Sequence, residues 1–284
     1  MKVLLLILVT YFAVSFSATG QSGPKNYTDL AEAMQNPESV EVLMLNEQGL
    51  TVFPDQIFEF KNLKYLELVN NQISVLPENF GDLSNLFYLN LSGNKLTEIP
   101  ASFTRLLSLR NLYVEYDAPD NLNRDFTLLS ALPLLSVLEI KGTQINYLPA
   151  TIGALKNLEY LELLNTRIEA LPSEFSLLTN LQVLYINNST RFNLQENIDV
   201  LSRLPNLSEL HLEGDDFTNI PSEISKLQSI EYLFLTDNNL KYLPPELNQL
   251  KNLKYLDVSK NDIPFHLLHL YRSDMAPTVR IRFN

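Results

Sequence analysis

The stretch LKYLELVNNQISVLPENFGDLSN, residues 63–85, decides the fold of this chain. Its apolar residues begin as L-x-x-L-x-L and continue through an isoleucine, a leucine, a phenylalanine and a further leucine. Twenty-three residues are too few to enclose that many apolar side chains. The segment therefore needs neighbours of the same kind to bury them.

The same pattern recurs along the chain in steps of 23 or 26 residues. Its starts are Val40, Leu63, Leu86, Leu109, Leu135, Leu158, Leu181, Leu207, Ile230 and Leu253. Repeats of this length each form a strand, a turn and a return path, and bury their leucines only against adjacent repeats. We therefore expect an α/β fold, a horseshoe-shaped leucine-rich-repeat solenoid of ten repeats over residues 40–264, with one parallel concave sheet.

A longer period lies above the first, because residues 109–180 and 181–252 are both 26+23+23 and align with each other. Duplication of a three-repeat block explains this. The 26-residue repeats lack the proline of the other repeats, and Phe126, Leu129 and Leu132 recur every three residues. We expect a convex helix there and short turns elsewhere, since proline breaks a regular helix.

The ninth repeat position normally carries asparagine, whose amide satisfies backbone groups where the strand becomes a turn. This chain has Gln48, Asn71, Asn94, Asp117, Thr143, Thr166, Ser189, Asp215, Asn238 and Asn261 there. An ionised aspartate only accepts hydrogen bonds. The turns at Asp117 and Asp215 should therefore deviate from the common geometry.

Both ends of an open solenoid need caps. Residues 21–39 predict an N-terminal capping helix, with residues 27–36 helical up to Pro37 and Leu30, Ala33 and Met34 on the inner face. Residues 265–284 predict a C-terminal cap with a helical segment and a last strand, TVRIRF.

Residues 1–20 have the pattern of a secretory signal peptide: Lys2, an apolar run and small residues before Gln21. Cleavage at Ser15 or Ser17 is an alternative. An uncleaved anchor is disfavoured because the 12 apolar residues are short for a hydrocarbon core of about 30 Å. We expect export to the periplasm, the cell surface or the medium, without stable membrane insertion after signal removal.

Composition excludes several chemistries. The chain has no Cys, which excludes thiol catalysis, disulfides, cysteine-zinc sites and iron–sulfur clusters. Its 33 acidic and 21 basic residues give a net charge of −12. This charge argues against binding nucleic acid or anionic lipid and favours a basic or neutral partner. We expect no cofactor.

The repeats fit the consensus LxxLxLxxNxLxxLPxxIxxLxN, and the chain resembles the 23-residue class of leucine-rich-repeat proteins shared by Ras-group scaffolds and secreted bacterial proteins. The segment YTDLAEAMQNPESVEVLML resembles the capping helix of the secreted bacterial members. The resemblance implies a bacterial source and protein–protein interaction through the concave sheet. The predicted signal peptide separates this chain from the cytoplasmic Ras-binding members.

Repeat positions 3, 5 and 7 alternate with the buried leucines, so their side chains should face the concave side. Seven of these residues are acidic, and Lys141 is the one Lys or Arg among them. The candidate partner-binding residues are Tyr65, Tyr88, Tyr113, Glu139, Tyr160, Glu162, Tyr185, His211, Tyr232, Phe234 and Tyr255.

Aromatic residues at position 5 are the strongest candidates. Tyr113, Tyr185 and Phe234 should be exposed there and act as rigid anchors for a partner. Truncating Tyr113 and Tyr185 should then abolish binding and leave stability nearly unchanged. Tyrosines at position 3 have the alternative role of packing across strands.

Two groups of acidic residues are candidates for catalysis or metal binding. Glu139 and Glu162 lie in register on adjacent strands, without a nucleophile or an orienting histidine beside them. Glu209, His211 and Glu213 share the concave face, but alternate residues on a strand are roughly 6.5–7 Å apart, wide for one metal ion. The sequence therefore predicts no catalytic or metal site, and a non-catalytic exported protein-binding module. Glycan binding through the same tyrosines is the alternative, and hydrolysis is a distant third.

Overall fold

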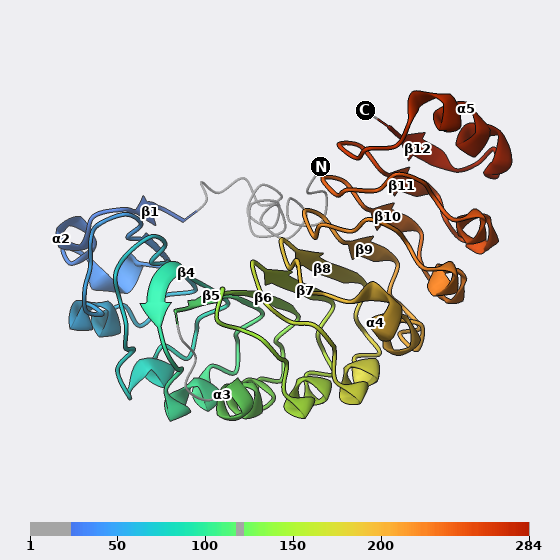
Figure 1. Ribbon diagram of the computed structural model, residues 1–284. Coiled ribbons are helices and arrows are strands. Elements are labelled where there is room, and N and C mark those ends of the chain that lie inside the picture. The colour runs from blue at the N-terminus through green and yellow to red at the C-terminus, as the bar shows by residue number, and fades with distance from the viewer. Residues whose placement is uncertain (1–23, 118–121, 284) are drawn as a thin grey trace.

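The computed structural model describes residues 24–117 and 122–283. Its centre is one sheet of twelve parallel strands that follow each other in chain order. Figure 1 shows the sheet along the inner side of a curved array, with the helices on the outer side. The predicted fold class, a curved leucine-rich-repeat solenoid, is confirmed.

Strands β2 to β11 each begin at the third position of a repeat. The strand bounds are β1 Asn26–Tyr27, β2 Val42–Met44, β3 Tyr65–Glu67, β4 Tyr88–Leu96, β5 Asn111–Tyr116, β6 Val137–Lys141, β7 Tyr160–Leu164, β8 Val183–Asn187, β9 Glu209–His211, β10 Tyr232–Phe234, β11 Tyr255–Asp257 and β12 Arg280–Arg282. Adjacent strands pair with equal repeat positions opposite each other, as in Tyr65 with Tyr88 and Glu139 with Glu162. The predicted register is therefore correct.

The return paths differ between the two repeat lengths. The 26-residue repeats carry α-helices, α3 (Leu122–Leu129) and α4 (Leu194–Leu201), as expected. Short 3-10 turns occupy the other return paths. These are η2 Asp55–Glu59, η3 Phe80–Asp82, η4 Ala101–Arg105, η5 Ala150–Ala154, η6 Ser173–Leu177, η7 Ser222–Lys226 and η8 Pro245–Gln249.

The leucines at the fourth repeat position of β2 to β11 point away from the concave face into one continuous core. Leu161 and Leu233, for example, are fully buried. Phenylalanines add a second row under the return paths, where the ring centroids of Phe80 and Phe103 lie 5.2 Å apart. The core is thus shared by neighbouring repeats and belongs to no single one of them.

Asparagines at the ninth position connect the turns of successive repeats. The side-chain amide of Asn238 donates to the carbonyls of Leu212 and Leu235, and its oxygen accepts the N–H of Asp215 and Phe217. Asn71, Asn94 and Asn261 make equivalent bonds. Each turn therefore depends on the repeat that follows it.

The N-terminal helix is shorter than residues 27–36. Helix α2 covers Leu30–Ala33, because the Asp29 side chain accepts the Glu32 N–H and caps its start. Tyr27 instead lies in β1, which pairs with β2 and extends the sheet. A 3-10 turn, η1 (Pro37–Ser39), leads into the first repeat.

At the other end, α5 (Phe265–Asp274) and β12 follow the last repeat, and β12 pairs with β11.

The predicted signal peptide, residues 1–20, lies outside the described residues. Within residues 24–117 and 122–283, no helix has the length and apolar character needed to cross a membrane.

Candidate binding surface

Aromatic side chains on the concave face form two stacks. The first, on β3 to β5, contains Tyr65, Tyr88 and Tyr113, with ring centroids 4.1 Å and 5.2 Å apart. Tyr65 and Tyr88 occupy equal repeat positions on adjacent strands about 4.8 Å apart, and Tyr113, two positions further along β5, packs diagonally against Tyr88. Stacked rings in this geometry attract each other and hold one rotamer.

The second stack, on β7 to β11, is longer and contains Tyr160, Tyr185, His211, Phe234 and Tyr255. His211 lies between Tyr185 and Phe234, at centroid distances of 3.6 Å and 4.0 Å and nearly parallel to both rings. Seven of the eight predicted aromatic residues thus lie in the two stacks together with His211, and Tyr255 is the last ring of the second stack.

The two stacks are separated at β6 and β7 by two carboxylates in register, Glu139 and Glu162. The Tyr160 hydroxyl donates to Glu162 Oε2 at 2.7 Å. Glu162 is only 9% exposed, while Glu139 is half-buried. The middle of the concave face is therefore acidic, with aromatic surface on both sides.

The expected exposure of Tyr113 is wrong. Tyr113 and Tyr160 are each 5% exposed and form a small cluster with Val137 and Val183, separate from the main core. Val137 on β6 and Val183 on β8 lie opposite Tyr160 on its two sides, and Tyr113 packs in the same cluster from β5. Truncating Tyr113 would open a gap in this cluster, so stability would not remain unchanged.

Tyr185 packs at the edge of the same cluster and remains half-buried. Burial, with the neighbouring glutamates, raises the pKa of the Tyr160 and Tyr185 hydroxyls above the ordinary tyrosine range. Burial likewise raises the pKa of Tyr113. These hydroxyls therefore stay protonated and can donate hydrogen bonds across the concave face at neutral pH.

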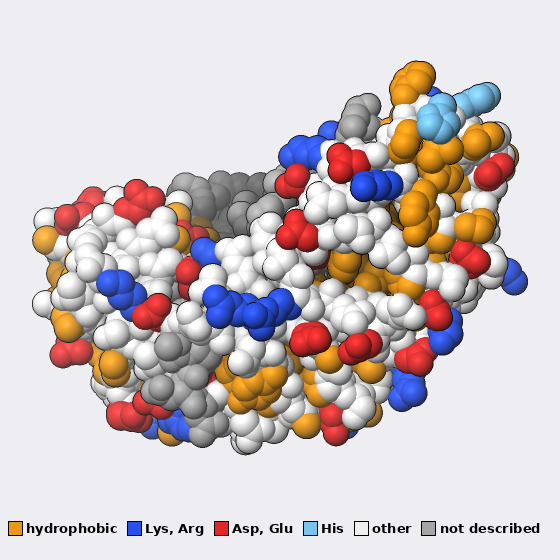
Figure 2. All heavy atoms as spheres, in the orientation of Figure 1, with side chains coloured by type: hydrophobic (Ala, Val, Ile, Leu, Met, Phe, Trp, Pro, Cys, Tyr) orange, Lys and Arg blue, Asp and Glu red, His pale blue; other side chains and the backbone are white. Residues whose placement is uncertain are grey.

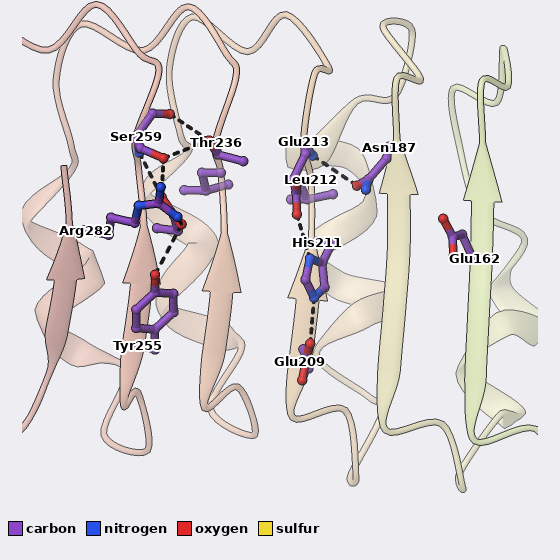
Figure 3. A network of polar contacts seen from close by, with 12 residues as sticks. Glu162, Asn187, Glu209, His211, Leu212, Glu213, Thr236, Tyr255, Ser259 and Arg282 are labelled. Carbon is purple, nitrogen blue, oxygen red and sulfur yellow. Dashed lines mark hydrogen bonds and ion pairs between the residues drawn. The ribbon is translucent and has the colours of Figure 1, made fainter. Parts of the chain in front are cut away.

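Glu209, His211 and Glu213 form one hydrogen-bonded group along β9 (Figure 3). His211 Nε2 lies 2.7 Å from Glu209 Oε1, and Nδ1 lies 2.7 Å from Glu213 Oε1. Both carboxylates have turned toward the imidazole, which holds their rotamers. Among residues 24–117 and 122–283, no cluster of three or more acidic or histidine side chains is arranged to hold a metal ion.

Polar residues that were not among the predicted site residues complete the surface. Asn187 accepts the Glu213 N–H at 3.1 Å, as Figure 3 shows. On β11, the buried Asp257 accepts from Ser259 Oγ at 2.6 Å and lies 3.3 Å from Arg282 Nη1. The repeat pattern placed Asn187 and Asp257 on this face, but nothing in it indicated these partners.

At position 7, Lys141 lies 2.9 Å from Glu115 on the adjacent strand. At position 3, the Tyr65 hydroxyl donates to Glu67, and Tyr232 is 36% exposed. Tyr232 is thus the most accessible of the predicted aromatic residues of the second block.

A second apolar surface lies on the C-terminal helix α5. Phe265 is 88% exposed and Leu270 is 53% exposed. Figure 2 shows apolar side chains and histidines gathered at this end of the molecule. His266 and His269 are the exposed histidines of α5, outside the two concave stacks.

Family models match most of the chain. Residues 121–216 match a leucine-rich repeat region, and residues 38–96, 77–118 and 205–263 match the leucine rich repeat. The chain belongs to the leucine-rich-repeat proteins. Among curated proteins, a search finds no match to this leucine-rich-repeat protein.

Solved structures agree with this family. An internalin from Listeria monocytogenes is 21% identical with a TM-score of 0.65, over 88% of this chain and 68% of that one. The leucine-rich-repeat domain of the type III effector XopL is 26% identical with a TM-score of 0.55, over 90% and 79%. A plant peptide hormone receptor, RGFR1 in complex with RGF2, is 23% identical with a TM-score of 0.50, over 86% and 44%. The repeats of this chain therefore have the architecture of a protein–protein interaction module.

Proposed function

We propose that this leucine-rich-repeat protein is a non-catalytic, exported module that binds a protein with a basic or neutral surface across its concave sheet. The observation that carries the proposal is the arrangement of the two aromatic stacks around Glu139 and Glu162. Rigid aromatic side chains are typical anchors of protein interfaces.

Preorganisation supports a binding role for this face. The rings stack on one another, and His211 holds the Glu209 and Glu213 side chains in place. A partner would thus meet groups that have already lost their rotamer freedom, which lowers the entropic cost of association. The RGFR1 receptor, of similar fold, is described in complex with RGF2, which is consistent with a polypeptide partner.

Charge favours a basic partner. Glu139 and Glu162 lie side by side between the stacks, and Glu209 and Glu213 follow on β9. Lys141 is already paired with Glu115. Lysine or arginine side chains of a partner would find carboxylates next to tyrosine rings, where both ion pairing and cation–π contacts stabilise them.

Glycan binding is the second candidate function. Saccharide rings stack on tyrosines such as Tyr232, which is 36% exposed, and their hydroxyls bond to carboxylates. Ionic strength separates the two functions, because screening weakens a charge-steered protein complex and barely affects stacking of a neutral sugar.

Export rests on the signal-peptide pattern of residues 1–20. We expect protein recovered outside the cytoplasm to begin at Gln21. N-terminal sequencing of exported material checks this, and a chain that still begins at Met1 would contradict it.

The binding function is tested by capturing partners with residues 21–284 from the cell envelope and from host extracts, and then measuring the affinity of each identified partner. Glu139→Lys and Glu209→Lys should each weaken binding by tenfold or more, a change of about 1.4 kcal/mol. Binding should also weaken as salt rises.

Glu78→Lys is the matched control, because Glu78 is exposed beside the convex turn η3 and the charge change is the same. If the Glu78 variant weakens binding as much as the concave variants, net charge and not the concave face controls the affinity. A neutral oligosaccharide that binds with an affinity independent of salt concentration would favour the glycan alternative.

A further inference from the structure

Asp215 has an orphaned oxygen in the turn that follows β9. The residue is 2% exposed, and its Oδ1 accepts the Ser189 N–H at 2.7 Å. Its Oδ2 has no hydrogen bond. In the part of the chain that the structure describes, this is the single buried side-chain nitrogen or oxygen in that condition.

The asparagines at the same repeat position indicate what Oδ2 faces. In Asn238, the side-chain oxygen accepts from the preceding turn, and the amide nitrogen donates to the carbonyl three residues earlier, that of Leu235, at 3.1 Å. Asn261 does the same with Val258 at 3.0 Å. Because Oδ1 of Asp215 already accepts from the preceding turn, Oδ2 takes the place of the amide nitrogen. The carbonyl equivalent to Leu235 is then that of Leu212.

A carboxylate does not fit this place. Two oxygens that only accept would face each other, and the charge would be buried without a donor on that side. A carboxylic acid fits, because its hydroxyl donates as the amide does. Burial raises the pKa of Asp215 to about 8, opposed by the Ser189 N–H and reinforced by the carboxylates of Glu213 and Asp216.

We propose that Asp215 is protonated in the folded protein at neutral pH and donates its hydroxyl hydrogen to the Leu212 carbonyl, so that this turn is a pH-sensitive element beneath the concave face. The proton replaces one amide hydrogen of the asparagine ladder. The hydrogen bond to the strand carbonyl is thus donated by a carboxylic acid in this repeat and by asparagine amides in the repeats on its C-terminal side.

Charged groups around the turn oppose ionisation. Glu213 and Asp216 are the acidic neighbours on the same turn, and the following turn contributes the exposed Asp237. The preceding turn presents Asn188 and Ser189, which are uncharged. Loss of the proton would add a buried negative charge two residues from Glu213, the residue that holds His211 in the second stack. The expected result is a loosened turn beneath β8 and β9.

Asp215→Asn tests the proposal, since it supplies the amide found at Asn238 and keeps the shape of the side chain. The native pKa is raised above the unfolded value, so the acid stabilises the fold fully below about pH 4 and loses this effect as pH rises to about 8. We expect the unfolding constant of the natural protein, divided by that of the variant, to rise by up to about tenfold per pH unit in this window and then level off. Urea unfolding at a series of pH values measures this ratio.

A direct readout is the carboxyl carbon resonance of Asp215 in protein labelled at its aspartates, identified by its absence from the variant. We expect it to titrate near pH 8. Titration in the ordinary aspartate range, or an equal pH dependence of both proteins, would overturn the proposal.

Asp117→Asn is the matched control, because Asp117 occupies the same repeat position and is exposed. It should leave the pH dependence of stability unchanged. Calcium or sodium ions test the other way to neutralise Oδ2. If either ion stabilises the natural protein and not the Asp215 variant, a cation and not a proton closes the ladder, and the proposal fails.

Discussion

The two duplicated blocks, residues 109–180 and 181–252, share one backbone pattern and carry different side chains on the concave face. At position 5 the first block presents Tyr113, Glu139 and Glu162, and the second presents Tyr185, His211 and Phe234 in the equivalent places. Both blocks have a tyrosine first, and where the first block has two carboxylates the second has a stacked histidine and phenylalanine.

The difference changes how each block handles charge. In the first block, Glu162 is held by the Tyr160 hydroxyl, and Glu139 lies beside it. In the second, Glu209 and Glu213 are held by the imidazole of His211. The two blocks thus share the core and the register, and differ in the concave surface. Substitutions at equivalent positions of the two blocks test how far this difference extends.

The largest effect is expected in the shared core. Leu161 and Leu233 are equivalent in the two blocks and fully buried. Leu161→Ala and Leu233→Ala should each cost about 2–5 kcal/mol, because each leaves a cavity in the leucine rows. Urea unfolding measures both. Losses that differ by several-fold would mean that the two blocks pack their cores differently.

A smaller loss of stability is expected when a tyrosine of the concave face is truncated. Tyr113→Ala should cost about 2–4 kcal/mol because Tyr113 covers Val137 in the small concave cluster. Tyr185→Ala should cost less, since Tyr185 is half-buried. Thermal unfolding of both variants checks this order.

Tyr147→Ala provides the matched control. Tyr147 is 50% exposed and lies outside the concave stacks, so its truncation should change stability by no more than about 0.5 kcal/mol. Equal losses for Tyr113 and Tyr185 would show that concave packing, like the core, was preserved in both blocks.

The third comparison concerns the two convex helices, where Asp125 of α3 is equivalent to Asn197 of α4. Burial raises the pKa of Asp125 to about 6, although the Tyr116 hydroxyl donates to it at 2.8 Å. Asn197 is uncharged and accepts the Leu171 N–H at 2.7 Å. Because the folded pKa is raised, Asp125 should make stability fall by up to about 1.4 kcal/mol per pH unit between about pH 4 and pH 6.

Asp125→Asn should remove this slope, and urea unfolding at several pH values measures it. The reverse variant, Asn197→Asp, should introduce a comparable slope in the second block. An unchanged slope in Asp125→Asn would mean that the Tyr116 hydrogen bond and Arg124, 3.3 Å away, compensate for burial.

Much of the candidate surface was predictable because a parallel sheet with a fixed repeat places equal positions side by side. The adjacency of Glu139 and Glu162, and the concave row through Tyr185, His211 and Phe234, follow from counting residues. The N-terminal helix was predicted too long. The spacing of apolar residues does not reveal that Asp29 caps the N-terminus of α2, so that the helix begins only at Leu30.

The exposure of the aromatic residues was not predictable in the same way. The repeat position of a residue determines which face its side chain lies on, but not which neighbouring side chains pack over it. Tyr113 is buried because its ring packs in one cluster with Val137, which lies two residues before its register partner Glu139 on β6. That pairing depends on two repeats at once, and the single-repeat pattern does not contain it.

By itself, the sequence determined the solenoid, its register and the face on which each side chain lies, because the 23- and 26-residue periods impose the same geometry on every repeat. The tertiary structure alone decided the contacts between repeats. It brought Glu209 and Glu213 onto His211, buried Tyr113, and placed Oδ2 of Asp215 where an amide nitrogen belongs. The physical reason is that side-chain rotamers depend on the neighbouring side chains of adjacent strands, whereas the path of each strand is set by the repeat pattern.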